Sequence, residues 1–185
     1  MRSWFALALV VWATAAGAED IADKAEVCAT CHGDNGVPTE KDIPIIWGQN
    51  EGYLYIELGD MKKGARHNEK MTNAIADLDR ADILALAAWF AAKPWPVLPQ
   101  PRASKAEADH FTKMAASAGC PGCHQDGYKG AGTQPKIADQ SIPYLEKTML
   151  DFRDHVRGNN AWMTDLLQTY SPADIAEMAR VLGGW

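Results

Sequence analysis

Cys28-Ala29-Thr30-Cys31-His32 and its second copy, Cys120-Pro121-Gly122-Cys123-His124, decide how this chain folds. A Cys-x-x-Cys-His run is the attachment signature of a c-type haem: the two thiols form thioether bonds to the porphyrin, and the imidazole lies under the iron. The sequence therefore predicts two covalently attached haem c groups. The predicted attachment residues are Cys28, Cys31, Cys120 and Cys123, and the predicted iron ligands from the motifs are His32 and His124.

Two other kinds of site use Cys-x-x-Cys pairs, namely a four-thiolate zinc site and a thiol–disulfide redox centre. The pairs here are 89 positions apart, from Cys31 to Cys120, whereas paired zinc motifs are usually separated by roughly 15–20 residues. A redox pair needs a lowered thiol pKa. Neither alternative asks for a histidine after both pairs, so we favour the haem interpretation. All four cysteines lie in the motifs, and none remains for a structural disulfide or a thiolate ligand.

The chain also repeats itself outside the motifs. Tyr53 and Arg66 recur as Tyr144 and Arg157 at an offset of 91 positions. A repeat of this length predicts two small domains, each built on its own haem, because a large flat cofactor supplies core that about 80 residues would struggle to build alone. A Pro-rich join separates the copies. We therefore expect one domain over 19–93, a linker over 94–102 and a second domain over 103–185.

Helical patterns dominate both copies, so the predicted fold class is all-α. Asp79 and Ser171 are expected N-caps, because an acidic residue follows each of them three positions later. The expected helices cover residues 21–31, 51–63, 80–90, 103–120, 142–156 and 172–182. Glycine-rich loops follow each Cys-x-x-Cys-His motif.

The repeat selects the sixth iron ligands. Met71 lies 43 positions after Cys28, and Met163 lies 43 positions after Cys120. The remaining candidates have no such relation: Met61, Met114, Met149 and Met178 fit helix packing, and the histidines without a counterpart are His67, His110 and His155. The predicted ligand pairs are thus His32 with Met71 and His124 with Met163.

Such pairs close the coordination sphere of the iron, and a thioether ligand favours its ferrous state. A closed site predicts electron transfer and no catalysis. A catalytic or gas-sensing haem protein is the alternative from another class, and it would need an open or easily vacated site.

The first 18 residues have the pattern of a secretory signal peptide, with Arg2, an apolar run over 4–11 and Ala16-Gly17-Ala18 before a cleavage point. An uncleaved anchor is the alternative, although the apolar run is shorter than the roughly 20 residues that a spanning helix needs. Export agrees with haem attachment outside the cytoplasm, so we expect a periplasmic protein with no membrane span after cleavage.

Charge restricts the partners. Without residues 1–18 the chain has 17 basic and 24 acidic side chains, which argues against nucleic acid as a partner. Fourteen of the acidic residues, against eight basic ones, fall within 19–98. This imbalance favours either a partner with a basic face or a solvated acidic surface. Arg66 and Arg157 either pair with haem propionates or are solvated arginines at helix ends.

Three segments carry a family resemblance: CATCHGDNG from Cys28, IPIIWGQNEGYLYIELGDMKKGAR from Ile43 and MTNAIADLDRADILALAAWFA from Met71. They resemble the haem-binding unit of the dihaem cytochrome c4 family. The resemblance implies two class I cytochrome c domains packed face to face, and it implies the same two axial pairs. Residues 143–145 and 151–153 are also similar to the haem subunit of flavocytochrome c sulfide dehydrogenase.

Two functional hypotheses follow. The first is a periplasmic dihaem electron carrier between redox partner proteins, such as a membrane quinol-oxidising complex and a terminal oxidase or reductase. The alternative is the electron-accepting haem subunit of a dehydrogenase, such as a flavin-dependent sulfide dehydrogenase.

Overall fold

The structure is a computed structural model that describes residues 16–185, and the predicted signal peptide lies outside the described residues except for its last three positions. Over residues 16–185 the chain is helical and contains no β-strand, only an isolated bridge between Ala131 and Gln134. The helices are α1 (Ala16–His32), α2 (Glu51–Lys62), α3 (Glu69–Ala74), α4 (Arg80–Ala91), α5 (Lys105–Ala118), α6 (Cys120–His124), the short 3-10 helix η1 (Asp126–Tyr128), α7 (Ile142–Arg153), α8 (Ala161–Leu167) and α9 (Pro172–Gly183).

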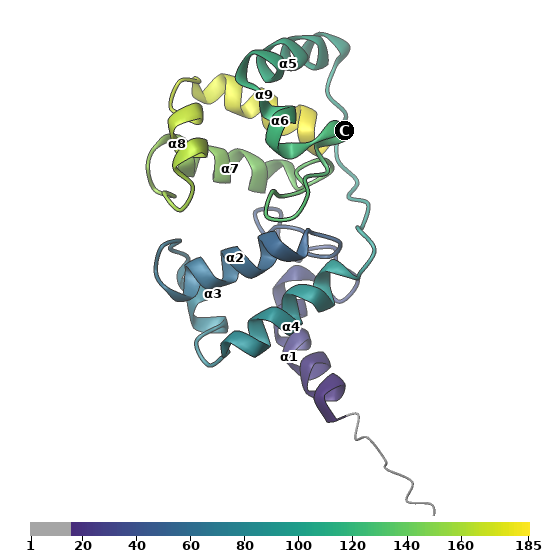
Figure 1. Ribbon diagram of the computed structural model, residues 1–185. Helices are drawn as coiled ribbons and strands as arrows, with labels where there is room; N and C mark the ends of the chain where they lie inside the picture. The colour runs from purple at the N-terminus through teal and green to yellow at the C-terminus, as the bar shows by residue number, and fades with distance from the viewer. Residues whose placement is uncertain (1–15) are drawn as a thin grey trace, which may run out of the picture.

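The helices form two lobes stacked on one another (Figure 1). We call residues 16–93 the N-lobe and residues 103–185 the C-lobe. Each lobe has its own apolar core, with Leu86 and Phe90 central to the first and Phe111 and Ile175 central to the second. The connecting segment, 94–102, runs along one side of the molecule. Two small cores that share no residue are what a sequence repeat of this length predicts.

The lobes use the same helix arrangement. In the N-lobe, α4 packs against both α1 and α2; in the C-lobe, α9 packs against both α5 and α7. The short helix α3 follows α2 as α8 follows α7. The order of elements therefore repeats along the chain, and equivalent residues of the two copies occupy equivalent positions.

Local capping explains where the outer helices begin. Asp79 and Ser171 are the N-caps of α4 and α9, as predicted, and each forms a reciprocal capping box with the acidic residue three positions later. Ser104 does the same for α5. An N-cap of this kind contributes about 1 kcal/mol.

Two helix predictions need correction. The helix expected over 103–120 is broken at Gly119, which has φ 74° and ends α5, so that the motif forms the separate helix α6. In the first copy Val27 stands at this position and α1 continues to His32. Gly119 adopts the left-handed conformation without steric cost, and Pro121 has no N–H to continue the helix. The helix expected over 142–156 ends at Arg153.

The lobes meet at the start of α2. Tyr53 N–H donates to Gly132 O at 3.1 Å, and Asn50 Nδ2 donates to Gln134 O at 2.7 Å. A Cβ on Gly52 would lie 2.8 Å from Gly132 O, so this approach requires glycine at position 52. Among residues 16–185 no helix combines the length and the apolar character needed to cross a bilayer.

Candidate functional site

A cavity of about 880 Å³ lies between the lobes and extends into both. Its wall contains six of the eight predicted site residues. They are Cys28, Cys31, His32, Met71, His124 and Met163. Cys120 and Cys123 lie beside His124 on α6, and the described cavity wall does not include them. The structure thus brings both predicted ligand pairs to one continuous space.

The two histidines are held in the same way. His32 Nδ1 lies 2.8 Å from Pro44 O, and His124 Nδ1 lies 3.1 Å from Pro135 O. A carbonyl oxygen can only accept, so Nδ1 carries the proton in both rings and Nε2 keeps its lone pair. Burial lowers the pKa of both imidazoles, although the bonds to the proline carbonyls act in the opposite direction. Each ring is therefore neutral and oriented, as an imidazole ligand to a metal must be.

The cysteines do not behave as a redox or zinc centre. No disulfide joins any of the four, and burial raises the pKa of Cys28 and Cys120, opposite to the lowered pKa that thiol–disulfide exchange needs. Across the described part of the chain, no three or more Cys, His, Asp and Glu side chains gather as they would around a metal ion. The two pairs stay in separate lobes, each next to its own histidine.

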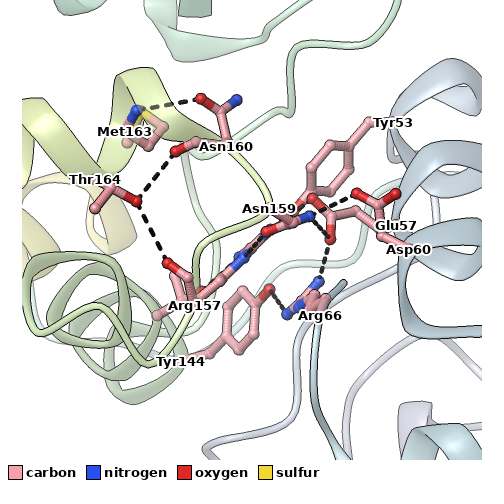
Figure 2. Close-up of polar contacts among 11 residues, drawn as sticks. Tyr53, Glu57, Asp60, Arg66, Tyr144, Arg157, Asn159, Asn160, Met163 and Thr164 are labelled. Carbon is pink, nitrogen blue, oxygen red and sulfur yellow. Dashed lines mark hydrogen bonds and ion pairs between the residues drawn. The ribbon is translucent and has the colours of Figure 1, made fainter. Parts of the chain in front are cut away.

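Met71 and Met163 lie at equivalent places in two short helices, where the sequence predicted no helix. Met71 is the third residue of α3, and its N–H donates to the cap Asn68 Oδ1 at 3.0 Å. Met163 is the third residue of α8, and its N–H donates to Asn160 Oδ1 at 3.1 Å (Figure 2). The signal was present as Asn-x-x-Met in both copies. A helix of six or seven residues is too short to show a 3.6-residue period.

Three of the competing residues also line the cavity. Met61 and Met149 are buried, as packing residues should be, yet they reach its wall, and so does His67. His110 instead pairs with Glu177 at 2.7 Å on the surface of the C-lobe. The ligand assignment is therefore tested best against Met61 and Met149.

A polar cluster crosses the interface beside the cavity (Figure 2). Arg66 Nη1 donates to Glu57 Oε2 at 2.8 Å, and Arg157 Nη2 donates to Glu57 Oε1 at 2.5 Å. Arg66 also donates to Tyr144 Oη at 3.2 Å, and Arg157 donates to Tyr53 Oη at 3.5 Å. Each arginine thus meets the tyrosine of the other lobe.

The cluster holds two guanidiniums and two carboxylates, of which only Glu57 bonds the arginines directly. Burial by itself would lower the pKa of Arg66 and Arg157, but the tyrosines and Glu57 beside them raise it, so both guanidiniums stay charged. The alternative of solvated arginines is wrong, since both side chains are largely buried. Asp60 joins the cluster through Asn159 and lies outside the described cavity wall, so the cluster presents two guanidiniums and one carboxylate to the cavity. A flat apolar macrocycle with anionic propionates fits this lining.

Comparison with known proteins finds relatives that are c-type cytochromes and electron acceptors. The chain is 30% identical over 170 residues to "Cytochrome c4" of Pseudomonas aeruginosa, covering 87% of this chain and 85% of that protein. It is 27% identical over 163 residues to "Thiosulfate dehydrogenase electron acceptor" of Thiomonas intermedia, covering 83% and 75%. Its fold matches the crystal structure of reduced recombinant cytochrome c4 from Pseudomonas stutzeri, with TM-score 0.79, 28% identity and coverage of 90% and 97%. No family model matches the chain.

Fold, paired motifs and relatives define a dihaem c-type cytochrome, an electron-transfer protein of two tandem class I domains that carries two covalent haem c groups and is not itself an enzyme. More narrowly, the chain belongs to the cytochrome c4 family. The predicted family, fold class and cofactors are confirmed.

Proposed function

We propose that each lobe holds one haem with its own residues. In the N-lobe, Cys28 and Cys31 attach the haem, and His32 and Met71 ligate its iron. The corresponding residues of the C-lobe are Cys120, Cys123, His124 and Met163. The observation that carries this assignment is the repeated geometry, in which a carbonyl-oriented histidine and an Asn-capped methionine line one cavity in both copies. The proposed domains are 19–93 and 103–185, joined by 94–102.

The haem iron supplies one-electron chemistry, alternating between its ferric and ferrous states. The residues of the chain would restrict the haem to electron transfer. Thioether ligation favours the ferrous form, and apolar side chains such as Leu86 and Phe90 line the cavity and limit access of water. Arg66 and Arg157, which line the cavity at the interface between the lobes, would hold anionic propionate groups there. Because both predicted ligand pairs line one cavity, two haems held by these residues would lie close enough to exchange electrons across the interface.

We further propose that the protein works in the periplasm, carrying electrons from a membrane quinol-oxidising complex to a terminal oxidase or reductase. Residues 1–18 have the pattern of an export signal. The acidic excess of the first half suits a partner with a basic face, and such pairing speeds association at low salt.

The second candidate is an electron-accepting subunit of a dehydrogenase. A relative of this chain is named a thiosulfate dehydrogenase electron acceptor, and a sulfur-compound dehydrogenase is thus the kind of partner to test. Trp162, next to Met163, is 88% exposed, and Val156 is also exposed. The repeat places Lys70 at the position of Trp162 in the N-lobe, so this exposed tryptophan has no counterpart there.

Gentle purification at low salt separates the two candidates. If a second polypeptide, with or without flavin absorbance, travels with the haem in fixed ratio through moderate salt, the protein is a subunit. Trp162→Lys should then release the partner, whereas Val97→Lys, at an equally exposed position in the linker, should not. If the haem band runs alone and exchanges electrons with membranes in a salt-dependent manner, the protein is a carrier.

A further inference from the structure

Two glutamines related by the repeat connect the lobes. Gln49 precedes α2 and Gln140 lies shortly before α7, at the same offset of 91 positions that relates Tyr53 to Tyr144. Their side chains are buried, since the residues are only 3% and 2% exposed. Each side chain reaches into the opposite lobe. A buried amide needs partners for its N–H and its oxygen, and both glutamines find them on the other lobe's backbone.

Each glutamine holds one residue at two points. Gln140 Nε2 donates to Ile45 O at 2.9 Å, and Ile45 N–H donates back to Gln140 Oε1 at 2.8 Å. Gln49 makes the same pair of bonds with Lys136, both at 2.8 Å. Ile45 and Lys136 are themselves equivalent in the repeat. Two-point contact fixes the direction of the held backbone as well as its position.

The held residues follow the prolines that orient the histidines. Pro44 C=O and Ile45 N–H belong to one peptide unit, which is planar and rigid. The oxygen of this unit accepts from His32 Nδ1, and its N–H donates to Gln140. Rotating the peptide would break both bonds together. In the C-lobe, the peptide between Pro135 and Lys136 joins His124 to Gln49 in the same way.

We propose that Gln49 and Gln140 are positioning residues that act across the interface, each fixing the peptide that orients the haem-ligating histidine of the other lobe. This inference rests on the proposed assignment of His32 and His124 as ligands. A hydrogen bond on Nδ1 sets the orientation and basicity of a ligating imidazole, and hydrogen bonds in series strengthen one another. The redox properties of each haem thus depend on a residue of the opposite lobe.

The test replaces each glutamine in the haem-loaded protein. Gln140→Met and Gln49→Met keep the side-chain length and remove the paired bonds. A redox titration is followed by NMR, in which the ring-current-shifted methyl signal of each ligating methionine reports its own haem. Met71→Leu and Met163→Leu assign the two signals to their lobes. Two such signals in the unsubstituted protein test the ligand assignment separately from the glutamines.

Each substitution should change the potential of the haem in the opposite lobe. At a fixed potential, Gln140→Met should raise the ratio of ferrous to ferric haem in the N-lobe by about three- to tenfold. The net contribution of one hydrogen bond corresponds to a factor of this size. Tenfold is about 59 mV for one electron. Gln49→Met should do the same to the C-lobe haem. The direction follows because a loosened Nδ1 bond makes the imidazole less basic and favours ferric iron less.

Gln100→Met is the matched control. Gln100 also bonds backbone, at Gln140 O, Gly183 O and Ile142 N–H, but touches neither proline peptide, so neither haem should shift. Gln140→Leu, which removes the same two bonds with a shorter side chain, should shift the N-lobe haem in the same direction, and it serves if the methionine variant does not fold. A shift confined to the lobe that carries the substitution, an equal shift of both haems, or no shift overturns the proposal.

Discussion

Arg157 of the C-lobe donates a 2.5 Å hydrogen bond to Glu57 of the N-lobe, although its counterpart in the repeat, Arg66, finds no acid across the interface. The reason is one substitution between the copies: the position of Glu57 in α2 is occupied by Thr148 in α7, and Arg157 donates to Thr148 Oγ1 at 2.7 Å. A single buried carboxylate therefore serves both guanidiniums and breaks the symmetry of the interface.

Glu57→Gln should destabilise the protein strongly. Removing one partner of a buried ion pair leaves charge uncompensated and costs about 3–5 kcal/mol; the remaining amide oxygen can still accept one bond, so we expect about 3 kcal/mol. Urea unfolding of the haem-loaded protein measures it. Glu51→Gln, at an exposed position at the start of the same helix, should change stability by less than about 0.5 kcal/mol. Equal effects of both changes would contradict the role of the cluster.

Substituting methionine by leucine tests the ligand assignment. Met71→Leu and Met163→Leu keep volume but remove the sulfur, so the ferrous protein should gain carbon monoxide binding at one haem in each variant. The potential of that haem should fall by on the order of 0.1 V, a fraction of the roughly 0.8 V that axial ligands span. Carbon monoxide difference spectra and redox titrations measure both effects.

The matched controls for this test are Met61→Leu and Met149→Leu, because these methionines line the same cavity. Neither should bind carbon monoxide. If Met61→Leu opened a site and Met71→Leu did not, the ligand of the first haem would be Met61.

Two glycines should respond in opposite directions to alanine. Gly36 has φ 81°, and a Cβ there would lie 2.7 Å from the ring of Trp47, so Gly36→Ala should cost about 1–2 kcal/mol from the backbone conformation alone. Gly59 lies in α2 with open space around it, and Gly59→Ala should stabilise by about 0.5–1 kcal/mol. Thermal unfolding of both variants measures the difference. A stabilising Gly36→Ala would contradict the left-handed backbone conformation at this position.

The free energy of unfolding should depend on pH through the carboxyl group of Glu107. Hydrogen bonds from Ser104 N–H, then from the Ser104 hydroxyl and Arg180, lower the pKa of Glu107 from 4.5 to about 2. Because the folded pKa is the lower one, this stabilisation is complete above about pH 4.5 and is lost as pH falls towards 2. Glu107→Gln, which preserves the capping box, should be less stable than the wild type at pH 6 and equally stable near pH 2.

Ser104→Ala is the control for Glu107. It should remove part of the same pH dependence, since the backbone bond to Glu107 remains. Urea midpoints measured from pH 2 to pH 6 for the three proteins decide between these outcomes, and a difference between wild type and Glu107→Gln that grew on acidification would contradict the assignment.

Signals between neighbouring residues were visible in the sequence. The two Cys-x-x-Cys-His motifs predicted the cofactor class, and the caps Asp79 and Ser171 predicted where two helices begin. Such signals survive without a structure because the interacting groups lie within a few residues of each other. Helix ends were harder to predict. Gly119 ends α5, although the helical pattern of the sequence continues past it. A glycine in the left-handed conformation ends a helix through its own φ angle and leaves the pattern of apolar residues around it unchanged.

By itself, the sequence determined that this protein has two similar halves, each with one haem attachment motif, and which histidine and methionine are equivalent in them. Only the tertiary structure decided what those halves do to one another: that Glu57 serves two arginines, and that Gln49 and Gln140 reach the peptides next to the opposite histidines. Those contacts join residues about 90 to 100 positions apart, and they exist only because the two lobes pack in one orientation. No local pattern encodes that orientation.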